Sequence, residues 1–213
     1  MTIVRTVLST LLVTTAGFAA KPNVIVIVAD DVGYADVGFH DVVAEGVCTP
    51  NLDKLAESGV VFRNAYSSSP VCSNSRLALS TGRYAQRWGA YYYGQGGMPS
   101  SEGTIAEMMR EAGYRTMKVG KTHLNGGPKE LPTKQGFDHS LSFQHHSWHY
   151  HLLSEKDVAA YENKKEGSSK AASRAAPFGP MIGEIMRSLD AKGIADNTIV
   201  FFTSDNGGSN QSY

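Results

Sequence analysis

The chain has 213 residues, with 20 basic and 20 acidic side chains and 41% hydrophobic residues. This length corresponds to one or two domains, and the apolar content is enough for a sizeable core, which excludes a largely disordered chain. Because the charges balance, no overall field favours nucleic acid or an anionic membrane surface as a partner. Any selectivity for an anion must therefore be local.

The first residues have the pattern of an export signal. One basic residue, Arg5, precedes an apolar run at 7–13, and small residues follow up to Ala20. The apolar run is too short to span a bilayer, and cleavage after Ala19 leaves small residues before the cut. The sequence predicts a signal peptide over 1–19, an exported (periplasmic or secreted) protein and no membrane span. A buried N-terminal strand is the alternative.

A buried strand is predicted next, over residues 24–29. These residues form an unbroken apolar and mainly β-branched run, which is typical of a strand covered on both faces of a parallel sheet. The run ends in Asp30 and Asp31. Adjacent carboxylates at the end of a buried strand are costly unless a cation pairs with them, and Ca²⁺ or Mg²⁺ takes such oxygen ligands. A solvated acidic turn is the alternative.

Two scaffold elements follow the acidic pair. Thr49 is placed to cap a helix, Pro50 suits its first position and Gly59 its end. The apolar residues at 60–62 then predict a short strand.

The segment 71–83, with the sequence VCSNSRLALSTGR, carries the most information about function. It predicts a helix over 73–80 that places Cys72 and Arg76 on one face. The first turn of a helix offers unpaired N–H groups and positive dipole character, so an anion beside Cys72 meets backbone donors and a guanidinium together. Such a site suits sulfate or phosphate. The alternative is a buried cysteine that only packs.

A second cation and a histidine follow another predicted helix and strand. Thr104 and Glu107 form a capping box for the helix, and the strand is predicted over 114–119. In an extended chain Lys121 and His123 point the same way, so an ammonium and an imidazole can converge on one anion. A surface lysine and a capping histidine are the alternative.

Residues 139–180 carry no pattern that predicts an element. Five histidines lie between His139 and His151, and they suit a transition metal or a sulfated sugar, although their loose spacing favours an ordinary surface set. Residues 163–176 are polar and of low complexity, which predicts a loop or linker.

The last elements repeat the design of the first strand. Helical periodicity at 182–189 precedes an apolar run at 199–202, and Asp205 and Asn206 follow the run. Two hydrophobic strands thus deliver hard oxygen ligands at their ends. The sequence predicts one divalent cation between this pair and the first acidic pair.

These segments resemble the type I sulfatases of the alkaline phosphatase-like superfamily. The segment 71–83 is similar to the family signature Cys-x-Pro-Ser-Arg with its later Thr-Gly-Arg, and Asn74 stands where the family usually has proline or alanine. Gly120-Lys121-Thr122-His123 resembles the Gly-Lys-x-His element, with Thr122 where tryptophan is common. Ser204-Asp205-Asn206-Gly207 resembles the second metal-binding element.

The resemblance covers residues 22–138 and 182–208. It implies an α/β fold with a mainly parallel sheet flanked by helices, with 21–213 as an incomplete sulfatase-like N-terminal domain whose C-terminal subdomain is missing. The family's Pro-His-x-Pro element is not visible, and its later active-site lysine is expected beyond Tyr213.

The function implied by the resemblance is hydrolysis of organic sulfate esters, in the manner of an arylsulfatase or a carbohydrate sulfatase. The resemblance implies that a formylglycine-generating enzyme oxidises Cys72 to formylglycine, whose hydrate attacks sulfur. It also implies that Arg76 and Lys121 neutralise charge in the reaction and that Lys121 and His123 contact the sulfate. The Ca²⁺ (or Mg²⁺) ligands implied are Asp30, Asp31, Cys72, Asp205 and Asn206. The substrate is a sulfated small molecule or a sulfated glycan.

Three alternatives stay open at this point. The chain can be a phosphate or phosphonate monoester hydrolase of the same superfamily, or a non-catalytic remnant that binds an anion or glycan. Cys48 and Cys72 can also form one structural disulfide, as in many exported proteins.

Overall fold

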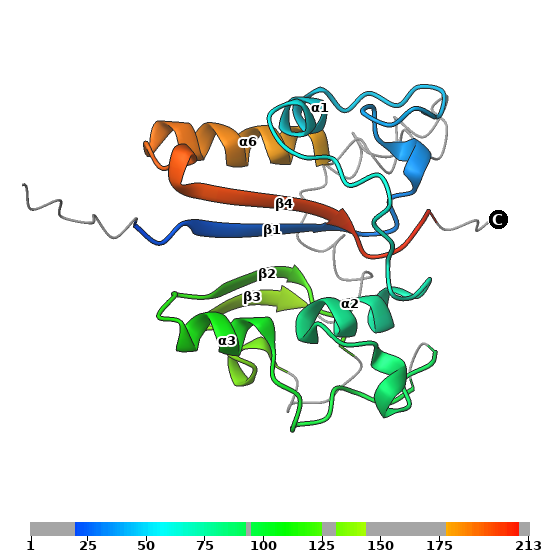
Figure 1. The fold of residues 1–213 in the computed structure, drawn as a ribbon, viewed down its shortest axis with the longest axis vertical. Helices are drawn as coiled ribbons and strands as arrows, with labels where there is room; N and C mark the ends of the chain where they lie inside the picture. The colour runs from blue at the N-terminus through cyan, green and yellow to red at the C-terminus, as the bar shows by residue number, and fades with distance from the viewer. Residues whose placement is uncertain (1–19, 93–94, 125–130, 144–177, 209–213) are drawn as a thin grey trace, which may run out of the picture.

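The computed structural model describes residues 20–92, 95–124, 131–143 and 178–208, and Figure 1 shows their arrangement. The helices are α1 (Pro50–Glu57), α2 (Cys72–Thr81), α3 (Ile105–Glu111) and α6 (Phe178–Ala191). The strands are β1 (Asn23–Ala29), β2 (Met117–Lys121), β3 (His139–Phe143) and β4 (Thr198–Ser204). Short 3₁₀ helices lie at Tyr34–Asp36, Ala85–Trp88, Pro132–Lys134 and Ala195–Asn197. No helix within the described ranges is long and apolar enough to cross a membrane.

The described strands form two parallel pairs. β1 pairs with β4, with Asn23 opposite Thr198 and Ala29 opposite Ser204, and β2 pairs with β3. All four strands point the same way in Figure 1, so their carboxyl ends lie on one side of the molecule. The predicted α/β fold with parallel strands and flanking helices is confirmed. In the described part of the chain the strands make two small sheets rather than one continuous sheet.

The main core lies between the β1–β4 pair and the two helices α1 and α6. Ile27 and Ala29 of β1 are buried against Leu52 of α1 and Ile182 of α6. The alternate residues of the strands, Val24, Val26, Ile199 and Phe201, are exposed. The prediction that this strand is covered on both faces is therefore wrong for the described residues, because the core helices pack on one face only.

Two further predictions differ from the structure. Val60 and Phe62 are 78% and 73% exposed and belong to no strand, since no described strand lies alongside to pair with them. The strand predicted over 114–119 is displaced toward the carboxyl side, as β2. The predicted signal peptide, the 163–176 loop and the histidines after His139 lie outside the described residues, and the domain boundaries stay a prediction.

Candidate active site

The helix α2 begins at Cys72 and ends where Gly82 adopts a left-handed φ of 67°. A left-handed residue after the last turn is the usual helix stop that glycine provides. Leu77 anchors the helix in a second core cluster with Ala85, Ala90 and Leu124. The helix therefore holds Cys72 at a fixed place, beside the carboxyl ends of the strands.

Arg76 lies one turn after Cys72 and is only 6% exposed. Its Nε is 2.7 Å from Asp205 Oδ2, its Nη2 is 3.3 Å from Asp30 Oδ1, and its Nη1 donates to the Lys121 carbonyl at 3.0 Å. One guanidinium thus ties the ends of β1, β4 and β2 to α2. Removing one partner of a buried charge pair of this kind typically costs about 3–5 kcal/mol.

Lys121 lies at the end of β2 and its Nζ is 2.5 Å from Asp30 Oδ1. Burial alone raises the pKa of Asp30, but the hydrogen bond and charge of Lys121, with Arg76, hold it below its usual value. Burial raises the pKa of Asp205 to about 6; the charge of Asp30 adds to this rise and Arg76 opposes it. The two carboxyl groups therefore have different pKa values, and Asp30 loses its proton at a lower pH than Asp205 does.

Asp31 and Asn206 are held together beside this cluster. Asn206 Nδ2 donates to Asp31 Oδ1 at 2.6 Å, and the Asp31 amide donates to Asp205 Oδ1 at 3.2 Å. Asp31 has a left-handed φ of 56°, a strained conformation that is concentrated at functional sites. The Oδ1 atom of Asn206 is buried and has no hydrogen-bond partner among the residues that the structure describes.

These residues fit a hard divalent cation. One ligand atom each from Asp30, Cys72 and Asp205 lie within 4.8 Å of one another. The unpartnered Asn206 oxygen adds a neutral donor, and carboxylate and amide oxygens are what Ca²⁺ prefers. The carboxylate of Asp31 is outside the three-residue group; the Asp31 amide donates to Asp205 of that group, and Asp31 Oδ1 accepts from Asn206.

His123 brings its imidazole to Cys72, with Nδ1 3.2 Å from Sγ. Its left-handed φ of 53° turns the chain after β2, so the predicted extended path is wrong although both Lys121 and His123 reach the site. Burial raises the pKa of the Cys72 thiol; the charge of Lys121 opposes this, and Asp205 and Asp30 add to it. A protonated thiol is a weak nucleophile and a weak metal ligand.

The other residues singled out in the sequence have definite places. Asn74 is fully buried, and its Nδ2 donates to the Ala90 carbonyl at 2.6 Å. His139 lies in β3, where its Nε2 is 3.1 Å from Arg115 Nη2. Cys48 is exposed and both cysteines are free, so the disulfide alternative is wrong.

Ser67 was not predicted as a site residue. Its Oγ lies 2.8 Å from Ser75 Oγ and 2.5 Å from the carbonyl oxygen of Asp205. No local pattern could have found it, because its partner is 138 positions away in the chain.

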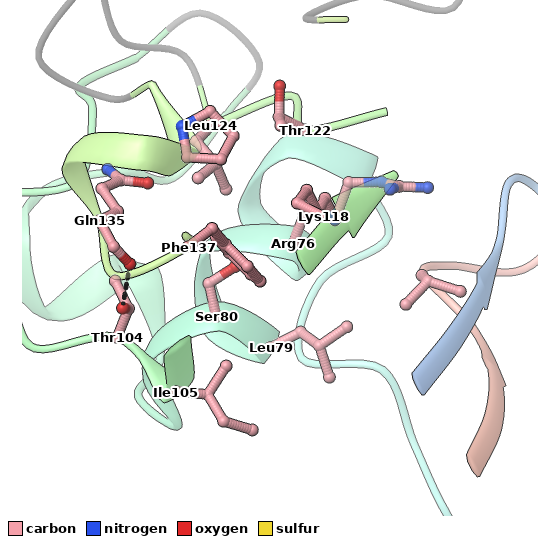
Figure 2. A pocket seen from close by; sticks show the side chains of 12 residues that line it. Arg76, Leu79, Ser80, Thr104, Ile105, Lys118, Thr122, Leu124, Gln135 and Phe137 are labelled. Carbon is pink, nitrogen blue, oxygen red and sulfur yellow. Dashed lines mark hydrogen bonds between the residues drawn. The ribbon is translucent and has the colours of Figure 1, made fainter. Parts of the chain in front are cut away.

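A small cavity of about 40 Å³ lies beside Arg76 (Figure 2). Its wall includes Ser80 of α2, Lys118 of β2 and Thr122, and neither Cys72 nor Asp205 lines it. The volume holds one or two water molecules and not a sugar.

The fold and this cluster define an α/β protein whose candidate anion and cation sites meet at the carboxyl ends of parallel strands, where open sheets bind their ligands. Residues 22–172 match the family model described as sulfatase, and the chain therefore belongs to the sulfatase family.

The chain is similar in sequence to two curated sulfatases and in fold to one solved structure. Mus musculus N-acetylgalactosamine-6-sulfatase is 30% identical over 278 aligned positions, which cover 94% of this chain and 53% of that protein. Homo sapiens arylsulfatase A is 42% identical over 142 positions, which cover 62% of this chain and 28% of that protein. The solved structure of Ps i-CgsB in complex with k-i-k-neocarrahexaose has a TM-score of 0.71 at 24% identity. The match covers 89% of this chain and 59% of that chain. The chain spans about half the length of the mouse and human N-acetylgalactosamine-6-sulfatases.

Proposed function

We propose that this chain hydrolyses sulfate monoesters to an alcohol and sulfate. The observation that carries the proposal is the convergence of Cys72, Arg76, Lys121 and His123 on one buried cluster, in a chain of the sulfatase family. The sugar in the name of the mouse relative favours a sulfated glycan or amino sugar as substrate over a sulfated small molecule.

Cys72 is the residue that a formylglycine-generating enzyme converts, and formylglycine supplies the nucleophilic oxygen. His123 Nδ1 lies 3.2 Å from the Sγ that this oxygen replaces, so it is placed to hold a proton there. Arg76 and Lys121 put two buried positive charges beside the same position, where the sulfate charge grows. The net reaction is hydrolysis of the ester by one water molecule. The oxygen of the water ends in the sulfate, one of its protons ends on the alcohol, and the other is released to solvent.

The same proposal includes a divalent cation, Ca²⁺ or Mg²⁺. Its ligands are residue 72 and four side chains at the ends of β1 and β4: Asp30, Asp31, Asp205 and Asn206. The grouped carboxylates and the unpartnered Asn206 oxygen support this set. The cation supplies a Lewis acid for a sulfate oxygen.

The test is turnover by protein coexpressed with a formylglycine-generating enzyme. We expect release of sulfate from 4-nitrophenyl sulfate and from N-acetylgalactosamine 6-sulfate, and no release by the Cys72→Ala variant purified in parallel. Preference for 4-nitrophenyl phosphate or a phosphonate ester over the sulfate contradicts the proposal and favours the related hydrolase. Binding of sulfate without turnover favours a non-catalytic remnant.

We also propose export directed by residues 1–19, on the basis of their sequence pattern. Amino-terminal sequencing of protein recovered from the periplasm or medium should begin at Ala20. A chain that keeps Met1 and stays in the cytoplasm contradicts this proposal.

A further inference from the structure

Two serines link the helix of Cys72 to the end of β4. Ser75 follows Cys72 by three residues in α2, so both side chains lie on the same side of the helix. Ser75 Oγ is 2.8 Å from Ser67 Oγ, which is 2.5 Å from the Asp205 carbonyl oxygen. A hydroxyl has one proton, so Ser67 donates it to the Asp205 carbonyl and accepts a hydrogen bond from Ser75. These two consecutive hydrogen bonds form a serine relay from α2 to the end of β4. The Ser69 carbonyl, at 2.9 Å, is the competing acceptor for Ser67.

The carbonyl at the end of this relay belongs to the peptide between Asp205 and Asn206. Other contacts hold the surrounding atoms toward β1: the Asp205 amide donates to the Ala29 carbonyl at 3.1 Å, and Asn206 Nδ2 donates to Asp31. The serine relay holds the carbonyl of the same peptide toward α2. Rotation of this peptide moves the Asn206 side chain, whose Oδ1 is the unpartnered buried oxygen.

We infer that Ser67 and Ser75 are positioning residues, which fix the Asp205–Asn206 peptide relative to Cys72 and so aim Asn206 Oδ1 at the cation. The inference rests on the proposed metal site for its consequence, but the geometry of the relay does not depend on that site. Ser75 is buried, and Ser67 contacts two buried residues although it is itself exposed. Loss of either hydroxyl leaves a buried polar atom without its partner, which lowers the stability of this arrangement by roughly the free energy of one hydrogen bond.

The experiment compares Ca²⁺ binding by calorimetry for the unmodified full chain and its variants. Ser67→Ala and Ser75→Ala should each weaken Ca²⁺ binding by about tenfold. The double variant should bind Ca²⁺ no less tightly than the single variant with the lower affinity, because either change alone already breaks the relay. Ser67→Thr keeps the hydroxyl and should bind like the parent. Ser68→Ala, at the neighbouring serine, is the matched control and should also bind like the parent.

Hydrogen exchange of the metal-free proteins gives a second readout that needs no cation. In Ser67→Ala the amides of 205–207 should exchange faster than in the parent, while the amides of β1 keep their rates. Unchanged exchange at 205–207 in Ser67→Ala overturns the inference, and so do additive losses of Ca²⁺ affinity in the double variant. If the parent binds no Ca²⁺, the proposed cation site is wrong, and the exchange rates alone decide whether the relay holds the peptide.

Discussion

Lys118 offers a test of how charge is distributed behind the site. It lies in the wall of the cavity beside Arg76 (Figure 2), and no described carboxylate forms an ion pair with it. Burial lowers the pKa of Lys118 to about 8, and the positive charge of Arg76 adds to this effect. A decrease from the ordinary 10.5 makes the charged side chain unfavourable in the folded protein by about 3 kcal/mol. We expect about 2 kcal/mol, because part of the side chain still meets solvent.

The perturbation is Lys118→Met, which removes the charge and keeps an unbranched apolar chain in the cavity wall. At pH 7 it should raise the free energy of unfolding by about 2 kcal/mol and Tm by about 4–8 °C. The folded state loses the lysine proton near pH 8 and the unfolded state only near 10.5, so the parent gains stability as pH rises between these values. The advantage of the variant should therefore shrink over the same window.

Urea denaturation at pH 7 and pH 9.5 measures both effects. Lys192→Met, at an exposed lysine after α6, is the control and should change stability little at either pH. A loss of stability in Lys118→Met at pH 7, or a gain that stays constant up to pH 9.5, would refute the reasoning about the buried charge.

The remaining predictions concern three other positions. Asp205→Ala should abolish tight Ca²⁺ binding in calorimetry and lower stability by about 3–5 kcal/mol, because it leaves a buried guanidinium without its nearest partner. Asn74→Pro should raise conversion of the neighbouring cysteine, measured by mass spectrometry, but lower stability by about 1–3 kcal/mol because a buried hydrogen bond is lost. Gly136→Ala should lower the free energy of unfolding by more than about 3 kcal/mol. Gly136 has a φ of 96°, and an added Cβ would collide with the backbone nitrogen of Glu107.

Each of these predictions has a specific contrary result. Parent-like Ca²⁺ affinity in Asp205→Ala rules out the ligand assignment, and unchanged conversion in Asn74→Pro shows that position 74 does not limit maturation. Gly103→Ala is the control for the glycine change, since nothing lies within 4 Å of its added Cβ. Equal stability of the two alanine variants contradicts the close approach at Gly136.

The sequence predicted the elements that carry strong local signals. Apolar β-branched runs predicted β1 and β4, and helix-start residues predicted α1 and α3, because these patterns act within a few residues. The capping box of Thr104 and Glu107 is confirmed, but the predicted cap at Thr49 is wrong, because its side chain donates to the Asp53 carboxylate and makes no capping hydrogen bond. The site residues were predicted from a family resemblance together with the acidic ends of two strands. Their convergence on Arg76 follows from parallel pairing, which brings strand ends to one side.

What the sequence did not predict depends on distant partners. β3 is a short strand of alternating polar and apolar residues, and it forms only beside β2. The segment 60–62 has strand-like residues but no described strand to pair with. Exposure of Val24 and Phe201 depends on which face the helices cover, and the Ser67 relay joins segments far apart in the chain.

The most direct test of the account is the chemical state of residue 72. Protein coexpressed with a formylglycine-generating enzyme is digested, and the mass of the peptide that carries this residue is measured by mass spectrometry. A second sample of the peptide is treated with a hydroxylamine probe. The account predicts a peptide in which oxygen has replaced the sulfur of Cys72 and which forms an oxime with the probe. A peptide that keeps its full thiol mass in every coexpression host, and does not react with the probe, contradicts the central claim that Cys72 becomes the nucleophile of a sulfatase.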